Sequence, residues 1–164
     1  EHLAPLCPLH QPPALAVIKA LMQRYPQQQH IAAFDTAFHA QQADLSRRYA
    51  LPVELYQQGI KSYGFHGLSC QSIMRQLATL EPNLAQGRVI IAHLGNGASV
   101  TAVYQGISQA TSMGFSTLDG LVMGTRCGHL DVGVLLYLLS QGWDEPRLNQ
   151  LLNRVHAEID SLVY

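Results

Sequence analysis

The amino-acid sequence predicts a mixed α/β fold. Residues 12–25 and 131–142 repeat apolar residues at helical spacing, whereas residues 88–94 and 98–104 are short apolar runs typical of strands. Of the 164 residues, 48% are hydrophobic, which is enough to bury a sizeable core in one ordinary domain. This combination favours a sheet flanked by helices.

The N-terminal part of the chain predicts a helix followed by a strand. Residues 12–25 open with prolines, which suit the first turn of a helix. HIAAFD, residues 30–35, is expected to form a short apolar strand that ends at Asp35, and a loop follows. Two short helical stretches are then expected around residues 45–49 and 53–58.

The middle of the chain predicts a turn into a helix and then a hairpin. IKSYGFHG, residues 60–67, is expected to form a strand and a turn, and Ser69 is expected to cap the next helix. Residues 88–94 and 98–104 form the hairpin, to which GISQA at 106–110 adds a third strand.

The charge and apolarity of the chain limit its partners. Only 13% of residues are Asp, Glu, Lys or Arg, against roughly 25% in an average soluble domain, so missing sequence or a partner subunit is expected to cover part of the surface. The apolar helix at 131–142 is expected to be buried in the core rather than to form a partner-binding stripe. A net charge of −1 without a basic cluster argues against nucleic acid or anionic membranes as partners and favours small molecules.

Several features bear on where the protein works. No apolar run approaches a membrane span, and no signal peptide opens the chain. The three cysteines show no CxxC spacing, which favours a reducing compartment and a cytoplasmic location. The chain starts at Glu1 and stops within a helical pattern, so we expect it to be a piece of a longer protein.

The hairpin turn at residues 93–97 carries an unusual set of residues. A Gly-Asn-Gly segment lets successive backbone N–H groups turn to one side, which suits the oxygens of a phosphate. His93, at the edge of the strand, can add a hydrogen bond to the same anion. Asn-Gly between apolar strands is also the strongest short hairpin signal, so a purely structural turn remains an alternative.

Three further residues occur where anion chemistry is common. His66 lies between glycines at the start of a helix, where the helix N-terminus favours anions. Arg126 lies in a glycine-flanked loop, where its guanidinium can bind phosphate or carboxylate, and Asp35 lies at a predicted strand end. Each residue also has a structural alternative: His66 as a core histidine, Arg126 in a surface ion pair and Asp35 as the cap of a turn. Their occurrence together with glycine-bearing loops favours an anion-binding site.

The sequence predicts no direct metal ligand. His30, His39, His66 and His93 lack the i,i+4 spacing of a metal site on a helix. Cys127, beside the loop arginine, is interpreted as a passive small residue in a tight loop rather than as a reactive thiolate.

Six stretches occur in the order seen in acetate kinases and the closely similar propionate kinases: APLCPLHQPPAL, FDTAFH, YGFHG, HLGNGAS, TSMGF and TLDGLVMGTRCG. The sequence resembles this family over nearly its whole length. The resemblance implies actin-like (ribonuclease H-like) ATPase domains, with a mixed sheet and flanking helices, incomplete in this chain. Residues 1–37 then form the tail of the N-terminal domain, and residues 38–164 the first part of the nucleotide-binding C-terminal domain.

The resemblance also implies a reaction, the reversible transfer of the ATP γ-phosphoryl group to acetate with Mg²⁺ present. A carboxylate substrate is already ionised at neutral pH, so the acid of the implied site is expected to organise Mg²⁺ through water rather than to move a proton. The implied catalytic residues are Asp35, His66 and Arg126, and those expected to line the ATP phosphates are His93, Leu94, Gly95, Asn96 and Gly97. His10 is expected near the cleft, and a purely structural place beside the helix N-cap is its alternative.

The implied ligands are ATP or ADP and acetate or another short-chain carboxylate, and the implied assembly is a homodimer. The chain alone is expected to be inactive. Two alternatives remain: a propionate kinase, and a non-catalytic nucleotide-binding module. The second alternative rests on Leu68, Cys70 and His129, which stand where the family usually has other residues.

Overall fold

The computed structural model describes residues 10–154, and the contacts divide the chain into two compact units, Glu1–Phe34 and Asp35–Tyr164. In the first unit, helix α1 (Gln11–Arg24) has prolines in its first turn, which confirms the helix predicted at 12–25. The strand predicted at 30–35 is wrong, because residues 30–34 have no regular structure and Ile31 is 84% exposed. A strand requires a hydrogen-bonded neighbour, and the three described strands pair only with one another.

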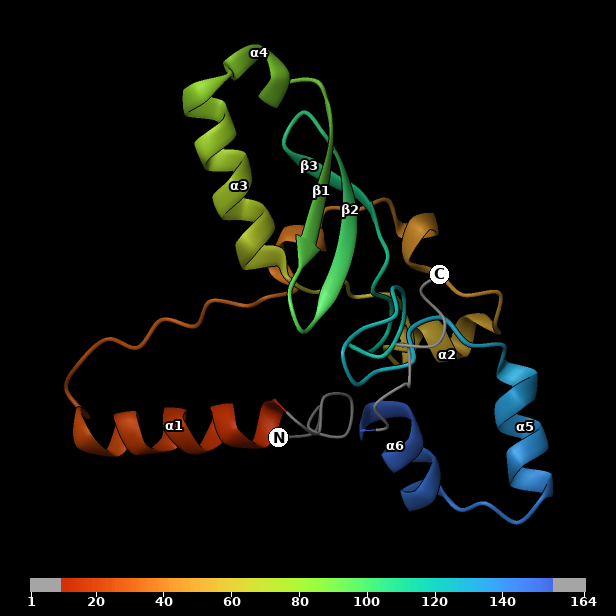
Figure 1. The fold of residues 1–164 in the computed structure, drawn as a ribbon. Helices are drawn as coiled ribbons and strands as arrows, with labels where there is room; N and C mark the ends of the chain where they lie inside the picture. Colours follow the sequence, from red (N-terminus) through yellow and green to blue (C-terminus); the bar gives the residue numbers. More distant parts are fainter. Residues whose placement is uncertain (1–9, 155–164) are drawn as a thin grey trace. The chain divides into compact units, whose positions relative to one another are not determined.

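The second unit contains an antiparallel sheet with the strand order β1 (Arg88–Leu94), β2 (Ala98–Tyr104) and β3 (Ile107–Thr111), shown in Figure 1. All three predicted strands are confirmed. Ile91 lies opposite Thr101, and His93 lies opposite Ser99. Because side chains alternate along a strand, these four residues share one face of the sheet.

Helix α3 (Gly67–Leu80) lies beside this face of the sheet (Figure 1). Its buried residues Cys70 and Met74 form an apolar cluster with Ile91 and Val103 of the sheet and with Ala85 of helix α4 (Pro82–Ala85). The helix therefore anchors its N-terminus at the end of the sheet where β1 ends and β2 begins.

The start of α3 differs from the expectation that Ser69 caps it. His66 occupies the N-cap position in the left-handed conformation, with φ 59°, and Ser69 lies inside the first turn. Gly67 is required there, since a Cβ would collide with the backbone oxygen of Asp35 and lie 2.9 Å from the Cβ of Phe38. The chain at Asp35 thus packs directly against the first turn of α3.

The 3₁₀ helix η2 (Ala37–His39) places a fully buried histidine between the helix and the sheet. One ring nitrogen of His39 lies 2.9 Å from the carbonyl oxygen of Phe65, and the other lies 2.9 Å from the hydroxyl of Ser108 on β3. Gln42 donates a further hydrogen bond to that hydroxyl. This network ties η2 and β3 to the residue that precedes His66.

The segments between η2 and α3 are mostly irregular. The two short helices expected there are the 3₁₀ helix η3 (Asp44–Arg47) and helix α2 (Val53–Gln57). The strand predicted at the start of IKSYGFHG is wrong, because the amides of Tyr63 and Gly64 both donate to the carbonyl of Gly114 in a loop rather than to a strand.

Helices α5 (Val132–Ser140) and α6 (Glu145–Arg154) complete the described chain. The helix predicted at 131–142 is confirmed, and Asp131 caps it by accepting a hydrogen bond from the amide of Gly133. Its predicted burial is wrong: α5 has no buried residue, and Leu136 is 66% exposed, because no other described segment covers it. None of the described helices is long and apolar enough to cross a membrane.

The buried histidine makes folding stability sensitive to pH. Burial lowers the pKa of His39 below its usual 6.5, so the neutral ring contributes stability that is present above that value and is lost as the pH falls below it. The loss is at most about 1.4 kcal/mol per pH unit for one proton. We expect chemical unfolding to show a larger loss of stability from pH 7.5 to 5.5 in the wild type than in His39→Gln. Equal losses in the two proteins contradict this assignment.

Candidate functional site

Asp35 organises the N-terminus of helix α3. One oxygen of its carboxylate accepts a hydrogen bond of 2.6 Å from the amide of His66, and the other accepts one of 3.3 Å from the amide of Leu68. The residue does not follow a strand, contrary to expectation, but it lies beside the predicted histidine. Its negative charge also occupies the helix end that the sequence analysis expected to be open to an anion.

The rings of His66 and His93 stack on one another, with centroids 4.0 Å apart and planes inclined by 16°. Nδ1 of His66 lies 2.9 Å from the hydroxyl of Ser99 on β2, and Nδ1 of His93 lies 3.1 Å from the hydroxyl of Ser69 on α3. Each histidine is therefore tied to the element opposite its own. The structure brings together two residues predicted from separate motifs.

The charge state of His66 follows from its surroundings. Burial lowers the pKa of His66 below its usual 6.5, and the nearby His93 and Arg126 side chains lower this pKa further. The Asp35 carboxylate acts in the opposite direction and raises it. At neutral pH the imidazole is therefore uncharged. An anion placed against the ring raises this pKa, because it stabilises the charged form.

Arg126 is a buried cation, with 8% of its surface exposed. Its Nη1 donates a hydrogen bond of 2.8 Å to the backbone oxygen of Thr117, which fixes the guanidinium. Among residues 10–154, no carboxylate lies within ion-pair distance of it. A buried guanidinium without an acidic partner is well suited to receive an anionic ligand.

Gly97 is the hairpin residue that lies next to both His66 and Arg126. A Cβ on this residue would lie 3.1 Å from Nε2 of His66 and 3.3 Å from Nη2 of Arg126. Neither Gly95 nor Gly97 has a positive φ, so a left-handed backbone does not explain these glycines. Gly97 is needed because a side chain would occupy the space between the histidine and the arginine.

The other hairpin residues contribute in different ways. The Asn96 side chain packs against Gly124 in the arginine loop, with its Oδ1 2.7 Å from the position of a Cβ there. Leu94 is the last residue of β1, and it is 75% exposed. His10 belongs to the first unit, at the N-cap position of α1, where its side chain makes no capping hydrogen bond.

Sequence reasoning missed the partners that orient these groups: Ser69, Ser99 and the backbone of Thr117. A signal for Ser99 was present, because a tight hairpin places it opposite His93 on the same face. No comparable signal exists for Thr117, whose contact depends on the path of an irregular loop.

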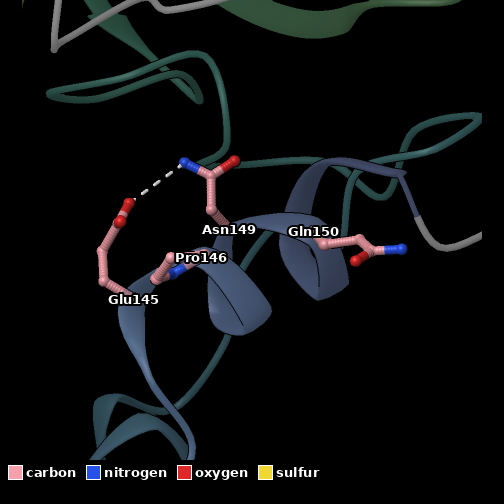
Figure 2. A pocket seen from close by; sticks show the side chains of 4 residues that line it. All are labelled: Glu145, Pro146, Asn149 and Gln150. Atoms are coloured by element: carbon pink, nitrogen blue, oxygen red, sulfur yellow. Dashed lines mark hydrogen bonds between the residues drawn. The ribbon is translucent and has the colours of Figure 1, made fainter.

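The described residues offer no direct metal site, since no group of three or more His, Cys, Asp or Glu side chains among them could hold an ion. A pocket on helix α6 is lined by Glu145, Pro146, Asn149 and Gln150 (Figure 2). It contains none of the predicted site residues, and its hydrogen bond from Asn149 to Glu145 links two residues of the same helix.

Comparisons with known proteins give a consistent result. A family profile described as the Acetokinase family matches residues 1–156. The acetate kinase of Methylocella silvestris is 50% identical over 139 residues, which cover 85% of this chain and 34% of that protein. The acetate kinase of Thermosynechococcus vestitus is 48% identical over 155 residues, which cover 94% of this chain and 37% of that protein.

Two solved structures are also similar. A propionate kinase from Francisella tularensis superimposes with a TM-score of 0.89 and 38% identity, covering 97% of this chain and 42% of that one. An acetate kinase from Entamoeba histolytica superimposes with a TM-score of 0.82 and 36% identity, covering 93% of this chain and 39% of that one. The chain thus spans a little over a third of the length of these curated relatives.

Proposed function

Since this chain belongs to the acetokinase family, we propose that the complete product of its gene transfers the γ-phosphoryl group of ATP reversibly to acetate, giving acetyl phosphate and ADP. One observation carries the proposal. A buried guanidinium that has no acidic partner among the described residues and an imidazole with a lowered pKa converge on the same glycine of a hairpin. That arrangement provides hydrogen-bond donors for a phosphoryl group without the cost of bringing them together.

The transfer requires little covalent chemistry from the protein. An oxygen of the ionised acetate attacks the γ-phosphorus while the bond from phosphorus to the terminal oxygen of ADP breaks, so no proton has to be removed. In this proposal Arg126 and Nε2–H of His66 donate to the oxygens of the transferring group. Both are held by neighbouring groups, the carbonyl of Thr117 and the hydroxyl of Ser99, before any substrate binds.

The hairpin is proposed to hold the remaining phosphates of the nucleotide. His93, Asn96 and Gly97 lie next to the catalytic pair, and Leu94 and Gly95 contribute their backbone at the exposed tip. The packing of Asn96 against Gly124 supports this role, because it links the hairpin to the arginine loop. His10 is proposed to lie near the cleft on the basis of the family resemblance alone.

Mg²⁺ is proposed to accompany the nucleotide and to supply positive charge to its phosphates. Magnesium in such sites keeps several waters and binds substrate phosphates plus one or two carboxylates. Asp35 fits a role through water, since each carboxylate oxygen accepts one backbone hydrogen bond and retains a lone pair. This chain's own residues then orient a hydrated ion and do not enclose it.

The domain organisation, cellular location and assembly of the protein are also proposals. Residues 1–37 form the tail of an N-terminal domain and residues 38–164 the start of the nucleotide-binding domain; the division of contacts after Phe34 supports a boundary in this region. We place the protein in the cytoplasm as a homodimer. Propionate is the second candidate substrate, because a propionate kinase structure is among the most similar ones.

The activity is tested directly with the complete gene product. Incubation with Mg²⁺, ATP and acetate, followed by trapping of the acyl phosphate with hydroxylamine, is expected to give acetyl hydroxamate. A parallel reaction with propionate identifies the preferred acid. Nucleotide binding without an acyl phosphate from either acid contradicts the proposal and supports the non-catalytic alternative.

Gly97→Ala is expected to lower kcat by roughly 10- to 100-fold, because small displacements of catalytic groups are costly. The new Cβ at 3.1 Å from Nε2 of His66 and 3.3 Å from Nη2 of Arg126 forces one of them to move. Gly95→Ala is the matched control, since its Cβ meets only the backbone oxygen of Gly97 at 3.4 Å and His93 at 3.5 Å. Equal kcat values for Gly97→Ala and Gly95→Ala contradict the proposal that His66 and Arg126 act together beside Gly97.

A further inference from the structure

Each histidine of the stacked pair is bonded through the same atom to a serine. Nδ1 of His66 lies 2.9 Å from the hydroxyl of Ser99, which is 1% exposed, and Nδ1 of His93 lies 3.1 Å from the hydroxyl of Ser69. A hydroxyl can either donate or accept, so these distances alone do not fix which ring nitrogen carries the hydrogen. The surroundings of the rings decide it.

His39 shows how a serine hydroxyl pairs with a histidine in the Nε2–H tautomer in this fold. The carbonyl oxygen of Phe65 can only accept, so Nε2 of His39 carries the hydrogen and Nδ1 is a bare acceptor. Ser108 must then donate to Nδ1, and its oxygen accepts the hydrogen bond from Gln42. All partners are satisfied in this single arrangement.

The same arrangement at His66 directs a donor into the site. Nε2 lies on the side of Gly97, near the guanidinium of Arg126. A bare Nε2 there would present a lone pair to an anion held by the arginine, which is unfavourable. A hydroxyl hydrogen of Ser99 on Nδ1 instead leaves the hydrogen on Nε2, where it can be donated to that anion.

The stacking of the rings disfavours a positive charge on both at once. Two imidazolium ions with centroids 4.0 Å apart repel one another, and the nearby guanidinium adds to the repulsion. The lowered pKa of His66 agrees with this picture. Neutral rings can donate from Nε2 only if Nδ1 is the acceptor.

We propose that Ser99 and Ser69 are positioning residues that hold His66 and His93 as neutral Nε2–H tautomers, so that both rings donate hydrogen bonds to the bound phosphate groups. The inference deepens the proposed function and rests on it for the identity of the acceptor. The serines touch neither substrate nor reacting atom. They act by fixing the direction in which each ring donates.

The tautomers can be read without turnover. In the complete gene product labelled with ¹⁵N-histidine, long-range ¹H–¹⁵N NMR at pH 7.5 is expected to show an unprotonated Nδ1 and a protonated Nε2 for both rings, assigned with His66→Gln and His93→Gln. A wild-type His66 or His93 that carries its hydrogen on Nδ1, or on both nitrogens, overturns the proposal. This measurement needs no serine variant, so it holds even if a variant fails to fold.

Serine variants then test the cause. Ser99→Ala is expected to shift His66 to a mixture of tautomers and to lower kcat by about 10-fold, with little change in the KM for ATP. Ser69→Ala is expected to shift the tautomers of His93 and to lower kcat in the same way. Ser72→Ala, an exposed serine on α3, is the matched control and leaves both rings unchanged. A Ser99→Ala protein with His66 still fully in the Nε2–H form overturns the proposal. Failure of the wild type to form any acyl phosphate instead contradicts the proposed function, and the NMR result separates the two cases.

Discussion

Replacement of Arg126 by alanine in the complete gene product is expected to lower kcat by roughly 10³-fold, with a much smaller effect on the affinity for ATP. The guanidinium is buried, is held by the carbonyl of Thr117 and has no acidic partner among the described residues. Its charge is therefore available to the phosphoryl group, where negative charge is redistributed in the transition state. Steady-state kinetics with hydroxylamine trapping measure the change.

Two further variants make this prediction specific. Arg126→Lys keeps the charge but loses the planar fork, so it should not restore the rate, because one ammonium cannot bond the Thr117 carbonyl and the phosphoryl oxygens in the same geometry. Arg88→Ala removes an exposed arginine from β1 and should leave kcat unchanged. Near-native turnover of the lysine variant contradicts the role given to the guanidinium.

The 164-residue chain on its own is expected to form no acetyl phosphate. Holding donor, metal and acceptor in line can supply on the order of 7–11 kcal/mol of the reduction in the barrier, and this requires both sides of a closed cleft. The chain spans only 34% and 37% of the acetate kinases compared above. Robust hydroxamate formation by the isolated chain shows instead that these residues suffice for catalysis.

The isolated chain is also expected to self-associate. Helix α5 exposes Val132, Leu136 and Tyr137, and no other described segment covers them. Apolar surface of this kind favours association in water. Light scattering during the activity assay tests this, and a monodisperse monomer at high concentration contradicts it.

Local patterns predicted much of the second unit. The strands of the hairpin and the third strand appear where alternation and turn residues placed them, since both signals act over a few residues. The strands expected at 30–35 and at the start of 60–67 were wrong, because an extended apolar run becomes a strand only when a partner completes its hydrogen bonds. The exposure of α5 has the same origin, since burial depends on segments distant in the sequence.

The candidate site was predictable as a set of residues but not as an arrangement. Glycine-flanked His66 and Arg126 and the hairpin at His93 were identified from their loops, and the structure places them together. The left-handed N-cap at His66 and its bonds to Asp35 could not be predicted, because they depend on contacts across 31 residues of chain. The serine partners required knowledge of the strand register.

The Asp35 carboxylate at the start of α3 limits the positive charge that the described residues offer to a ligand. Among the described residues, the formal charges of Asp35 and Arg126 cancel, and His66 adds little positive charge because burial lowers its pKa. In the proposed reaction, a nucleotide and a carboxylic acid anion bring several negative charges to the same place. We therefore expect a cation that arrives with these ligands to relieve their mutual repulsion, and a divalent ion carried by the phosphates meets that need. The capping carboxylate thus makes occupation of the site depend on the ionic form of the nucleotide as well as on its shape.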